Sequence, residues 1–297
     1  CSPLARKRLQ TWWGGRNGGR FIVAPMSSFH FAVSGIDTFL WLPPLAGFVL
    51  AFFCSMVGIS GAFLLMPFQL SVLGYAGPSA SATNLVYNLI SIPGSVWRYH
   101  WENRLWWRLG LVITAGGIPG TWLGAWLRTH HLAAREDFEI FVALVLAYLG
   151  ARMLADVLRP ATRLGTGGDE PSLPPLLPLL AASCAVGIIG TIYGIGGGSF
   201  MVPILVSVFR LPVHAVAGAT LTATLLTSIV AVLGYVALPT PAGIASSPDW
   251  ALGALFGIGG LVGGNLGTRC QRHVTQKVLK AFLAALLLGL ALRYVLV

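Results

Sequence analysis

The sequence Gly-Ile-Gly-Gly-Gly-Ser-Phe-Met-Val-Pro, residues 194–203, interrupts a long apolar segment with glycine. A related stretch, Gly-Ile-Ser-Gly-Ala-Phe-Leu-Leu-Met-Pro at residues 58–67, occupies the same kind of position 136 residues earlier (194 minus 58). Glycine-rich breaks expose backbone N–H groups that lipid cannot satisfy, so they are tolerated at membrane depth only where they line a cavity. Two breaks in corresponding positions are typical of the substrate site of a membrane transporter.

The composition around these breaks predicts a protein that crosses a membrane several times. Of the 297 residues, 56% are hydrophobic and only 9% are charged, whereas a soluble domain carries about 25% charged residues. Residues 21–97 contain a single charged residue, Asp37, and residues 171–248 contain only Arg210. Each of these two segments is long enough for several spans of about 20 residues.

The formal net charge of +10 comes from basic residues that lie between the apolar segments. Basic residues in such positions are typical of the loops that flank membrane spans. We therefore interpret them as topology determinants and lipid headgroup contacts, and we expect no nucleic-acid partner. The four cysteines, Cys1, Cys54, Cys184 and Cys270, are far apart and form no Cys-x-x-Cys, so they predict neither a metal site nor a disulfide framework.

The apolar pattern predicts an all-α integral membrane protein with two homologous halves. Residues 1–38 are expected to form a basic tail and an interfacial segment, 39–158 a first membrane repeat, 159–175 a linker rich in Pro, Gly and charge, and 176–297 a second membrane repeat. Each repeat contains one Gly-broken helical block, 39–73 or 176–209, and three further segments near span length. These are residues 79–97, 105–127 and 138–157, then 212–237, 250–267 and 278–297. The count is about eight transmembrane helices in two four-helix halves.

The sequence does not decide whether each broken block crosses the membrane fully. The first block has about 35 residues, too many for one simple span. It is either a long tilted broken helix or a re-entrant hairpin. Full crossings make the two halves parallel, whereas re-entrant hairpins leave three crossings per half and make the halves inverted. Counting positive charges favours a cytoplasmic N-terminus with eight crossings, although it places the basic loop 269–280 on the wrong side.

A second correspondence between the halves is a pair of small-residue motifs. Gly120 and Gly124 stand four residues apart in one predicted span, and Gly263 and Gly267 do so in another. Small residues at this spacing let membrane helices approach closely. Both motifs therefore predict close helix packing.

Each break is followed by polar residues that share one helix face, because they are spaced by four and then by three residues. These residues are Asn84, Asn88 and Ser91 in the first half, and Thr220, Thr224 and Thr227 in the second. Polar side chains of a membrane helix must face the interior of the bundle. Interhelical hydrogen bonds, or bonds from hydroxyls to their own helix, would also account for them, and for the threonines this alternative stays open. For Asn84 and Asn88 we favour a cavity-lining role.

The chemistry of such a site is restricted by the absence of acidic residues. No Asp or Glu occurs in residues 39–101 or 171–248, so no carboxylate is available there to ligate a metal or to bind a cation. Hydroxyls, amides, backbone N–H groups and helix N-termini remain, and together they favour a small oxyanion. We expect the two breaks to meet near the middle of the membrane. The candidate substrate-binding residues are Ser60, Gly61, Asn84, Asn88, Gly196, Gly197, Ser199, Thr220 and Thr224.

These residues resemble the TauE/SafE family of sulfite exporters. The resemblance rests on residues 58–67, Ser-Ala-Thr-Asn at 81–84, Tyr-Gly-Ile-Gly-Gly-Gly at 193–198 and Ala-Gly-Ala-Thr-Leu at 217–221, and it covers residues from about 40 to 297. It implies a duplicated permease that carries small sulfur-containing oxyanions such as sulfite, sulfoacetate or thiosulfate, often outward. The chain departs from the family pattern at Ser60 and Ala62, which stand at positions that are usually Gly.

The expected function is therefore secondary transport of a small sulfur-containing oxyanion through the plasma or inner membrane. The expected partners are this anionic solute and the lipid bilayer, with no cofactor, metal or catalytic residue. A channel for small anions, or a membrane assembly protein without a transported solute, remain alternatives. An enzyme is disfavoured, because the apolar segments offer neither a nucleophile nor an acid–base pair.

Overall fold

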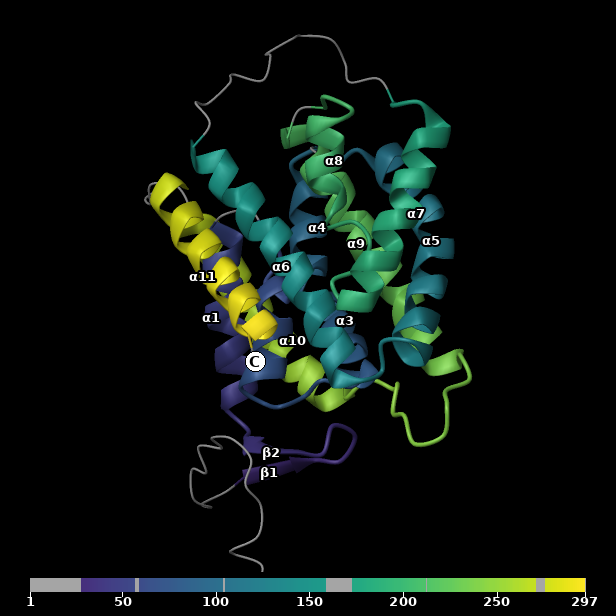
Figure 1. Cartoon of the computed structure of the whole chain (residues 1–297). Helices are drawn as coiled ribbons and strands as arrows, with labels where there is room; N and C mark the ends of the chain where they lie inside the picture. Colours follow the sequence, from purple (N-terminus) through teal and green to yellow (C-terminus); the bar gives the residue numbers. More distant parts are fainter. Residues whose placement is uncertain are drawn as a thin grey trace, which may run out of the picture.

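The structure is a computed structural model that describes residues 28–56, 59–103, 105–158, 173–211, 213–270 and 276–296. The predicted basic tail at 1–20 and residues 159–172 of the predicted linker lie outside the described residues. Within them, a helical bundle follows one small β-hairpin (Figure 1). The bundle agrees with the predicted helical membrane protein, whereas the hairpin was not predicted.

The hairpin pairs β1 (Ser28–Phe31) with β2 (Ile36–Phe39) in antiparallel register. Gly35 adopts φ 65° in the turn, a conformation that glycine reaches without steric cost. The two strands occupy part of the segment predicted to lie at the interface. Each strand has four residues, too few for an alternation of polar and apolar residues to be recognised in the sequence. A hydrogen bond from the turn to the end of the bundle, described below, holds the hairpin in place.

The helices follow one another with short connections. Their bounds are α1 Leu42–Met56, α2 Ala62–Ser71, α3 Pro78–Ser91, α4 Pro93–Trp101, α5 Trp107–His130, α6 Arg135–Leu158, α7 Leu176–Tyr193, α8 Met201–Ser207, α9 Val213–Ala237, α10 Trp250–Cys270 and α11 Gln276–Leu296. Among the described residues, α6, α7, α9 and α10 contain stretches long and apolar enough to cross a membrane. The helices α1 and α2, and most of α11, are shorter apolar helices.

Both predicted helix breaks are present at the glycine-rich motifs. The first break separates α1 from α2, with Gly61 just before α2; Gly58 lies outside the described residues. The second break separates α7 from α8. Gly194 and Gly196 there adopt φ 86° and 80°, which explains why glycine is required at both positions.

Two predicted spans differ from the helices observed. The span predicted at 79–97 is divided into α3 and α4, because Pro93 has no N–H to continue the ladder of hydrogen bonds. The span predicted to end at Leu127 continues as α5 to His130, so that Arg128 lies in a helix and not in the predicted loop.

The chain enters and leaves the first broken block at the same end of the bundle. Ser34 in the hairpin before α1 donates to the Oδ2 of Asp249 (2.8 Å), and the backbone N–H of Asp249 donates to Thr83 near the start of α3 (2.9 Å). The starts of α1, α3 and α10 therefore lie together, near the bottom of Figure 1. The helices α1 and α2 thus form a helical hairpin.

The second broken block enters from the opposite end. At the start of α5, Gly110 faces Ala219 near the start of α9, and Gly116 faces Leu180 near the start of α7. The other end of α5 reaches the start of α3, where Arg128 contacts Ser81. The helices α7 and α9 therefore begin at the top of Figure 1, where α8 also lies. The chain reverses at both breaks, as a re-entrant hairpin would; this was one of the two arrangements that the sequence left open.

Glycines allow the closest helix contacts in the bundle. A Cβ added at Gly124 would lie 2.7 Å from the carbonyl oxygen of Ile188 in α7, and one added at Gly263 would collide with the backbone of Phe48 in α1. The two predicted small-residue motifs are therefore confirmed as packing surfaces, α5 on α7 and α10 on α1. Outside this core, α6 packs along α11.

Candidate functional site

The tips of the two helical hairpins lie against each other inside the bundle. The hydroxyl of Tyr193, at the end of α7, donates to the carbonyl oxygen of Phe63 in α2 (2.8 Å). The ring of Phe63 also meets the ring of Phe200 edge to face, with 5.3 Å between centroids. The two breaks are thus in contact, as the repeated motif predicted, while their depth in a membrane stays a prediction.

Helix α3 connects the two breaks through its predicted asparagines, which are both fully buried. The amide nitrogen of Asn84 donates to the carbonyl oxygen of Ala62 at the first break (3.0 Å). The amide nitrogen of Asn88 donates to the carbonyl oxygen of Ile195 at the second break (2.7 Å). Since a carbonyl requires a donor, these bonds fix the orientation of both amides.

The opposite atoms of the same amides are free acceptors. In the described part of the chain, neither the Oδ1 of Asn84 nor that of Asn88 has a hydrogen-bond donor. Buried polar atoms are normally paired, so each unpaired atom calls for an explanation such as a bound solute or water. Both oxygens are placed to accept a hydrogen bond from a ligand at the breaks.

The donors expected at the second break are mostly in use. The N–H of Gly197 donates to the hydroxyl of Thr227 (3.0 Å), and the N–H groups of Ile195 and Gly196 both donate to the carbonyl oxygen of Gly190 (2.7 and 3.1 Å). The hydroxyl of Ser199 lies 3.4 Å from that of Thr224. At this break, the expectation that free N–H groups attract an anion therefore needs correction, because close packing of α9 supplies an acceptor to Gly197.

The threonine hydroxyls of α9 bond to their own helix. Thr220 donates to the carbonyl oxygen of Val216 (3.0 Å), and Thr224 donates to that of Thr220 (2.8 Å). This is the alternative that the sequence left open for the threonines. Their oxygens keep acceptor capacity, but their protons are not available to a solute in this conformation.

The first break is built more simply. The hydroxyl of Ser60 accepts a hydrogen bond from the N–H of Ala62, the first residue of α2 (3.3 Å). Gly61 packs so closely against the hydroxyl of Tyr87 in α3 that no Cβ would fit. Three predicted site residues thus lie at the first break: Ser60, Gly61 and Asn84. The other six lie around the second break, where the backbone of Thr220 packs against Gly198.

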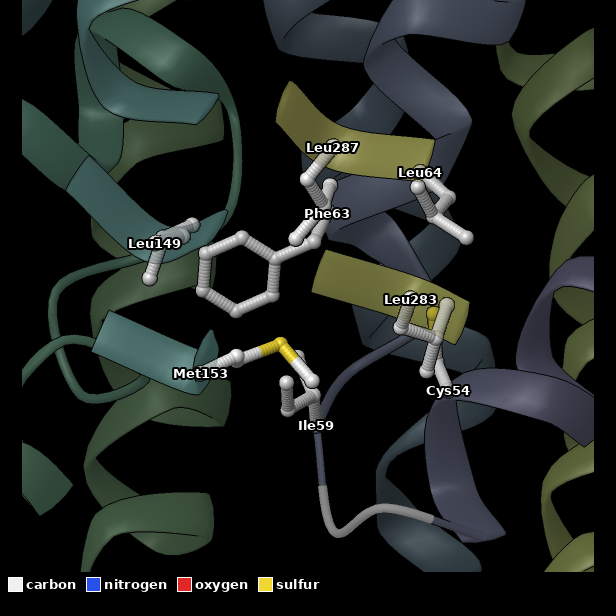
Figure 2. A pocket seen from close by; sticks show the side chains of 8 residues that line it. All are labelled: Cys54, Ile59, Phe63, Leu64, Leu149, Met153, Leu283 and Leu287. Atoms are coloured by element: carbon white, nitrogen blue, oxygen red, sulfur yellow. The ribbon is translucent and has the colours of Figure 1, made fainter. Parts of the chain in front are cut away.

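A small apolar cavity lies beside the first break, at the contact with α6 and α11 (Figure 2). It holds about 10 Å³, enough for at most one water-sized molecule. Its lining consists of Cys54, Ile59, Phe63, Leu64, Leu149, Met153, Leu283 and Leu287. None of the predicted site residues lines this cavity, and all of them except Ser60 and Ser199 are buried, so the candidate site is closed to solvent.

Sequence reasoning missed Arg128, which is fully buried at the end of α5. Its guanidinium donates to the hydroxyl of Ser81 (3.2 Å), to the carbonyl oxygen of Ala76 (2.5 Å) and to that of Leu132, and it lies 3.5 Å from the ring centroid of Phe138. Its burial could have been predicted from its spacing, because Arg128 follows Gly124 by four residues and therefore lies on the same buried face of α5.

The described residues hold no group of three or more His, Cys, Asp or Glu side chains that could bind a metal ion. The arrangement offers instead two helix breaks, two oriented amides and one buried cation. Groups of these kinds can form hydrogen bonds with a small polar solute.

Comparison with known proteins gives the family. The chain is 25% identical over 240 residues to a probable membrane transporter protein of Xylella fastidiosa (strain 9a5c), covering 78% of this chain and 87% of that protein. It is 23% identical over 265 residues to one of Methanocaldococcus jannaschii, covering 84% and 94%, and 25% identical over 250 residues to one of Sinorhizobium fredii, covering 82% and 93%. No solved structure matches the chain. The family model of the sulfite exporter TauE/SafE matches residues 44–294, so this integral membrane protein belongs to that family of transporters.

Proposed function

We propose that this chain is a secondary transporter that moves a small sulfur-containing oxyanion, such as sulfite, thiosulfate or a sulfonate, outward across the cell membrane. The observation that carries the proposal is the meeting of two glycine-rich helix breaks, joined by the buried amides of Asn84 and Asn88. Broken helices that meet inside a bundle are the usual setting of a transporter's substrate site. The family membership supports the same class of function.

The arrangement of the helices supports two homologous halves, residues 39–158 and 176–297. Helix α5 of the first half packs on α7 and α9 of the second, and α10 of the second half packs on α1 and α3 of the first. The contacts of α5 with the second half thus correspond to the contacts of α10 with the first half. Because the broken blocks enter from opposite ends, we propose that the halves are inverted, with about eight membrane helices when each broken block counts as one.

The free acceptors at the breaks refine the choice of substrate. The oxygens of Asn84 and Asn88 lack donors, so they favour a solute that carries a hydrogen-bonding proton as well as a charge. A hydrogensulfite ion has both. The site holds no carboxylate, since residues 39–101 and 171–248 contain no Asp or Glu, and we therefore propose that it acts without a cofactor or a metal.

The test is transport in proteoliposomes that contain the purified protein. Labelled sulfite, thiosulfate and sulfonates are expected to leave loaded vesicles faster than from protein-free vesicles, and unlabelled oxyanion outside is expected to accelerate exit. This trans-stimulation separates a carrier from an anion channel, which shows none. Competition by cationic amines of similar size, without competition by oxyanions, would refute the proposal.

A further inference from the structure

Arg128 is a buried cation whose hydrogen-bond partners are all neutral. Arginine is almost never fully buried unless it is paired with an anion. Here the partners are a hydroxyl, two backbone carbonyls and an aromatic ring. Among the side chains that the structure describes, the ion pairs are His30–Asp37, Arg98–Glu102 and Arg135–Glu139, which all include exposed groups and do not include Arg128.

The backbone around Arg128 contributes partial charges of both signs but no full negative charge. Arg128 lies in the last turn of α5, at the negative end of that helix dipole, and the carbonyl oxygens of Ala76 and Leu132 accept hydrogen bonds from it. The guanidinium contacts Ala76 and Ser81, which flank the first turn of α3. The N-terminus of a helix carries the positive end of its dipole, roughly half an elementary charge.

The residue before α3, Gly77, has no side chain to cap this end, and backbone carbonyl oxygens accept from two of its first N–H groups: Ala245 from Ser79 (3.2 Å) and Gly77 from Ala80 (2.9 Å). A full positive charge and the N-terminus of α3 thus lie at one buried place. The carboxylate at this end of the bundle, Asp249, accepts from Ser34 and from the N–H of Leu252, and no described ion pair joins it to Arg128, so the place can still take an anion.

The position of Arg128 links it to the two breaks. Ser81, Asn84 and Asn88 are spaced by three and then four residues, so they share one face of α3. The hydroxyl of Ser81 accepts from Arg128 and donates to the carbonyl oxygen of Ile192, one turn before the second break (2.9 Å). A continuous polar face therefore leads along α3 from Arg128 to the amides at the breaks.

The planar arrangement of N–H donors in the guanidinium of Arg128 determines which anions can bind it. The guanidinium carries five N–H donors in a planar fork that matches two oxygen atoms of one anion. Three of these donors have the acceptors described above, which leaves one N–H on each terminal nitrogen. An anion with two or more terminal oxygens can bind both, a feature that sulfite, thiosulfate and sulfonates share.

We infer that Arg128 and the first turn of α3 form an oxyanion-binding site, and that Arg128 supplies the positive charge that selects the transported anion. The inference rests on the proposed function and deepens it: the donors at the second break are largely paired within the protein, so the charge selectivity comes from Arg128.

The test uses the purified full-length chain with Arg128→Gln and Arg128→Lys, and with Arg135→Gln as the matched control on the exposed end of α6. We expect Arg128→Gln to raise the transport KM for sulfite, and its dissociation constant from the detergent-solubilised protein, by at least about tenfold, because charge-assisted hydrogen bonds are lost. Arg128→Lys keeps the charge but not the fork, so its values are expected to lie between those of wild type and Arg128→Gln. Arg135→Gln is expected to match wild type.

Two outcomes separate this inference from the proposed function. Wild-type transport of sulfur oxyanions, combined with unchanged KM and binding in both Arg128 variants, would mean that Arg128 only clamps the loops around it; the inference then fails and the proposed function stands. If wild type neither binds nor transports any sulfur oxyanion, both fail. If Arg128→Gln does not fold, Arg128→Lys decides: an unchanged KM overturns the inference, and a KM raised severalfold supports it.

Discussion

At the scale of single residues, we propose that the amides of Asn84 and Asn88 have two functions in one side chain. Their nitrogens hold the backbone of the two breaks in place, and their oxygens have no donor within the described protein. An aspartate could not replace them, because an ionised carboxylate cannot donate to a carbonyl. The amide is thus the group that can bridge a break and still accept from a solute.

Replacing Asn88 tests this double function. We expect Asn88→Leu to abolish transport while the protein still inserts, and to lower the free energy of unfolding by about 1–3 kcal/mol, because the carbonyl oxygen of Ile195 loses its donor. Transport in proteoliposomes and thermal unfolding in detergent measure the two effects.

The matched control is Asn265→Leu, since among the described residues the amide of Asn265 donates to Leu261 of its own helix (2.8 Å) and to no residue of another helix. We expect this variant to retain transport. Wild-type transport by Asn88→Leu would show that the amide of Asn88 serves packing alone.

Ser199 offers a test of charge at the second break. Its hydroxyl is partly buried and lies 3.4 Å from that of Thr224. We expect Ser199→Asp to raise the KM for an anionic solute at least tenfold, because a carboxylate repels it in surroundings of low dielectric constant. Ser199→Ala is expected to change the KM by less than threefold, since the hydrogen bond described for this hydroxyl is long. Equal KM values for the two variants would contradict an anionic substrate.

At the scale of helices, glycine determines which elements touch. Helix α10 packs along α1 through Gly259, Gly263 and Gly267, at each of which a Cβ would collide with the backbone of α1 or a side chain on it. In a membrane the hydrophobic effect does not drive helices together, so this close packing supplies much of the attraction. The breaks are therefore held by a rigid frame of glycine-packed helices.

Two adjacent glycines in α10 give a matched pair of substitutions. An added Cβ at Gly263 meets the backbone of Phe48, whereas at Gly264 nothing lies within 4 Å. We expect Gly263→Ala to lower the free energy of unfolding by about 1–3 kcal/mol through overpacking. Gly264→Ala is expected to leave it unchanged or raise it by up to about 1 kcal/mol, because alanine favours helix. Thermal unfolding midpoints measure both, and equal midpoints would contradict the tight contact between α1 and α10.

At the scale of the whole molecule, the two broken blocks enter the bundle from opposite ends and meet at their tips (Figure 1). A closed contact between two such hairpins can open toward either end without dismantling the helices that frame it. This geometry is compatible with a carrier that works by alternating access, and it is why we propose that the substrate binds at the contact between the breaks.

The inverted arrangement that we propose predicts on which side of a membrane each loop lies. Single cysteines at exposed positions, Ala32 in the hairpin, Ala242 before α10 and Asn103 after α4, would be introduced after replacing the native cysteines with alanine. We expect a membrane-impermeant maleimide to label Ala32→Cys and Ala242→Cys from one side and Asn103→Cys from the other. Labelling of Asn103→Cys and Ala242→Cys from the same side would exclude inverted halves.

The sequence by itself determined the membrane class, both helix breaks and the glycine contact surfaces. These features depend on local chemistry: apolar length, the conformations open to glycine and the spacing of small residues. The asparagines at 84 and 88 were also found in this way, because a polar face in an apolar segment is visible along one helix.

Only the tertiary structure decided the direction of the broken blocks, the partners of the site residues and the burial of Arg128. Each depends on contacts between segments far apart in the chain: Arg128 meets Ser81 across 47 residues, and Asn88 meets Ile195 across 107. No local pattern shows whether a hydroxyl at the second break will bond its own helix, or whether an N–H there will find an acceptor on α9. These hydrogen-bond partners depend on which helices pack closely at their glycines, and therefore on the assembled bundle.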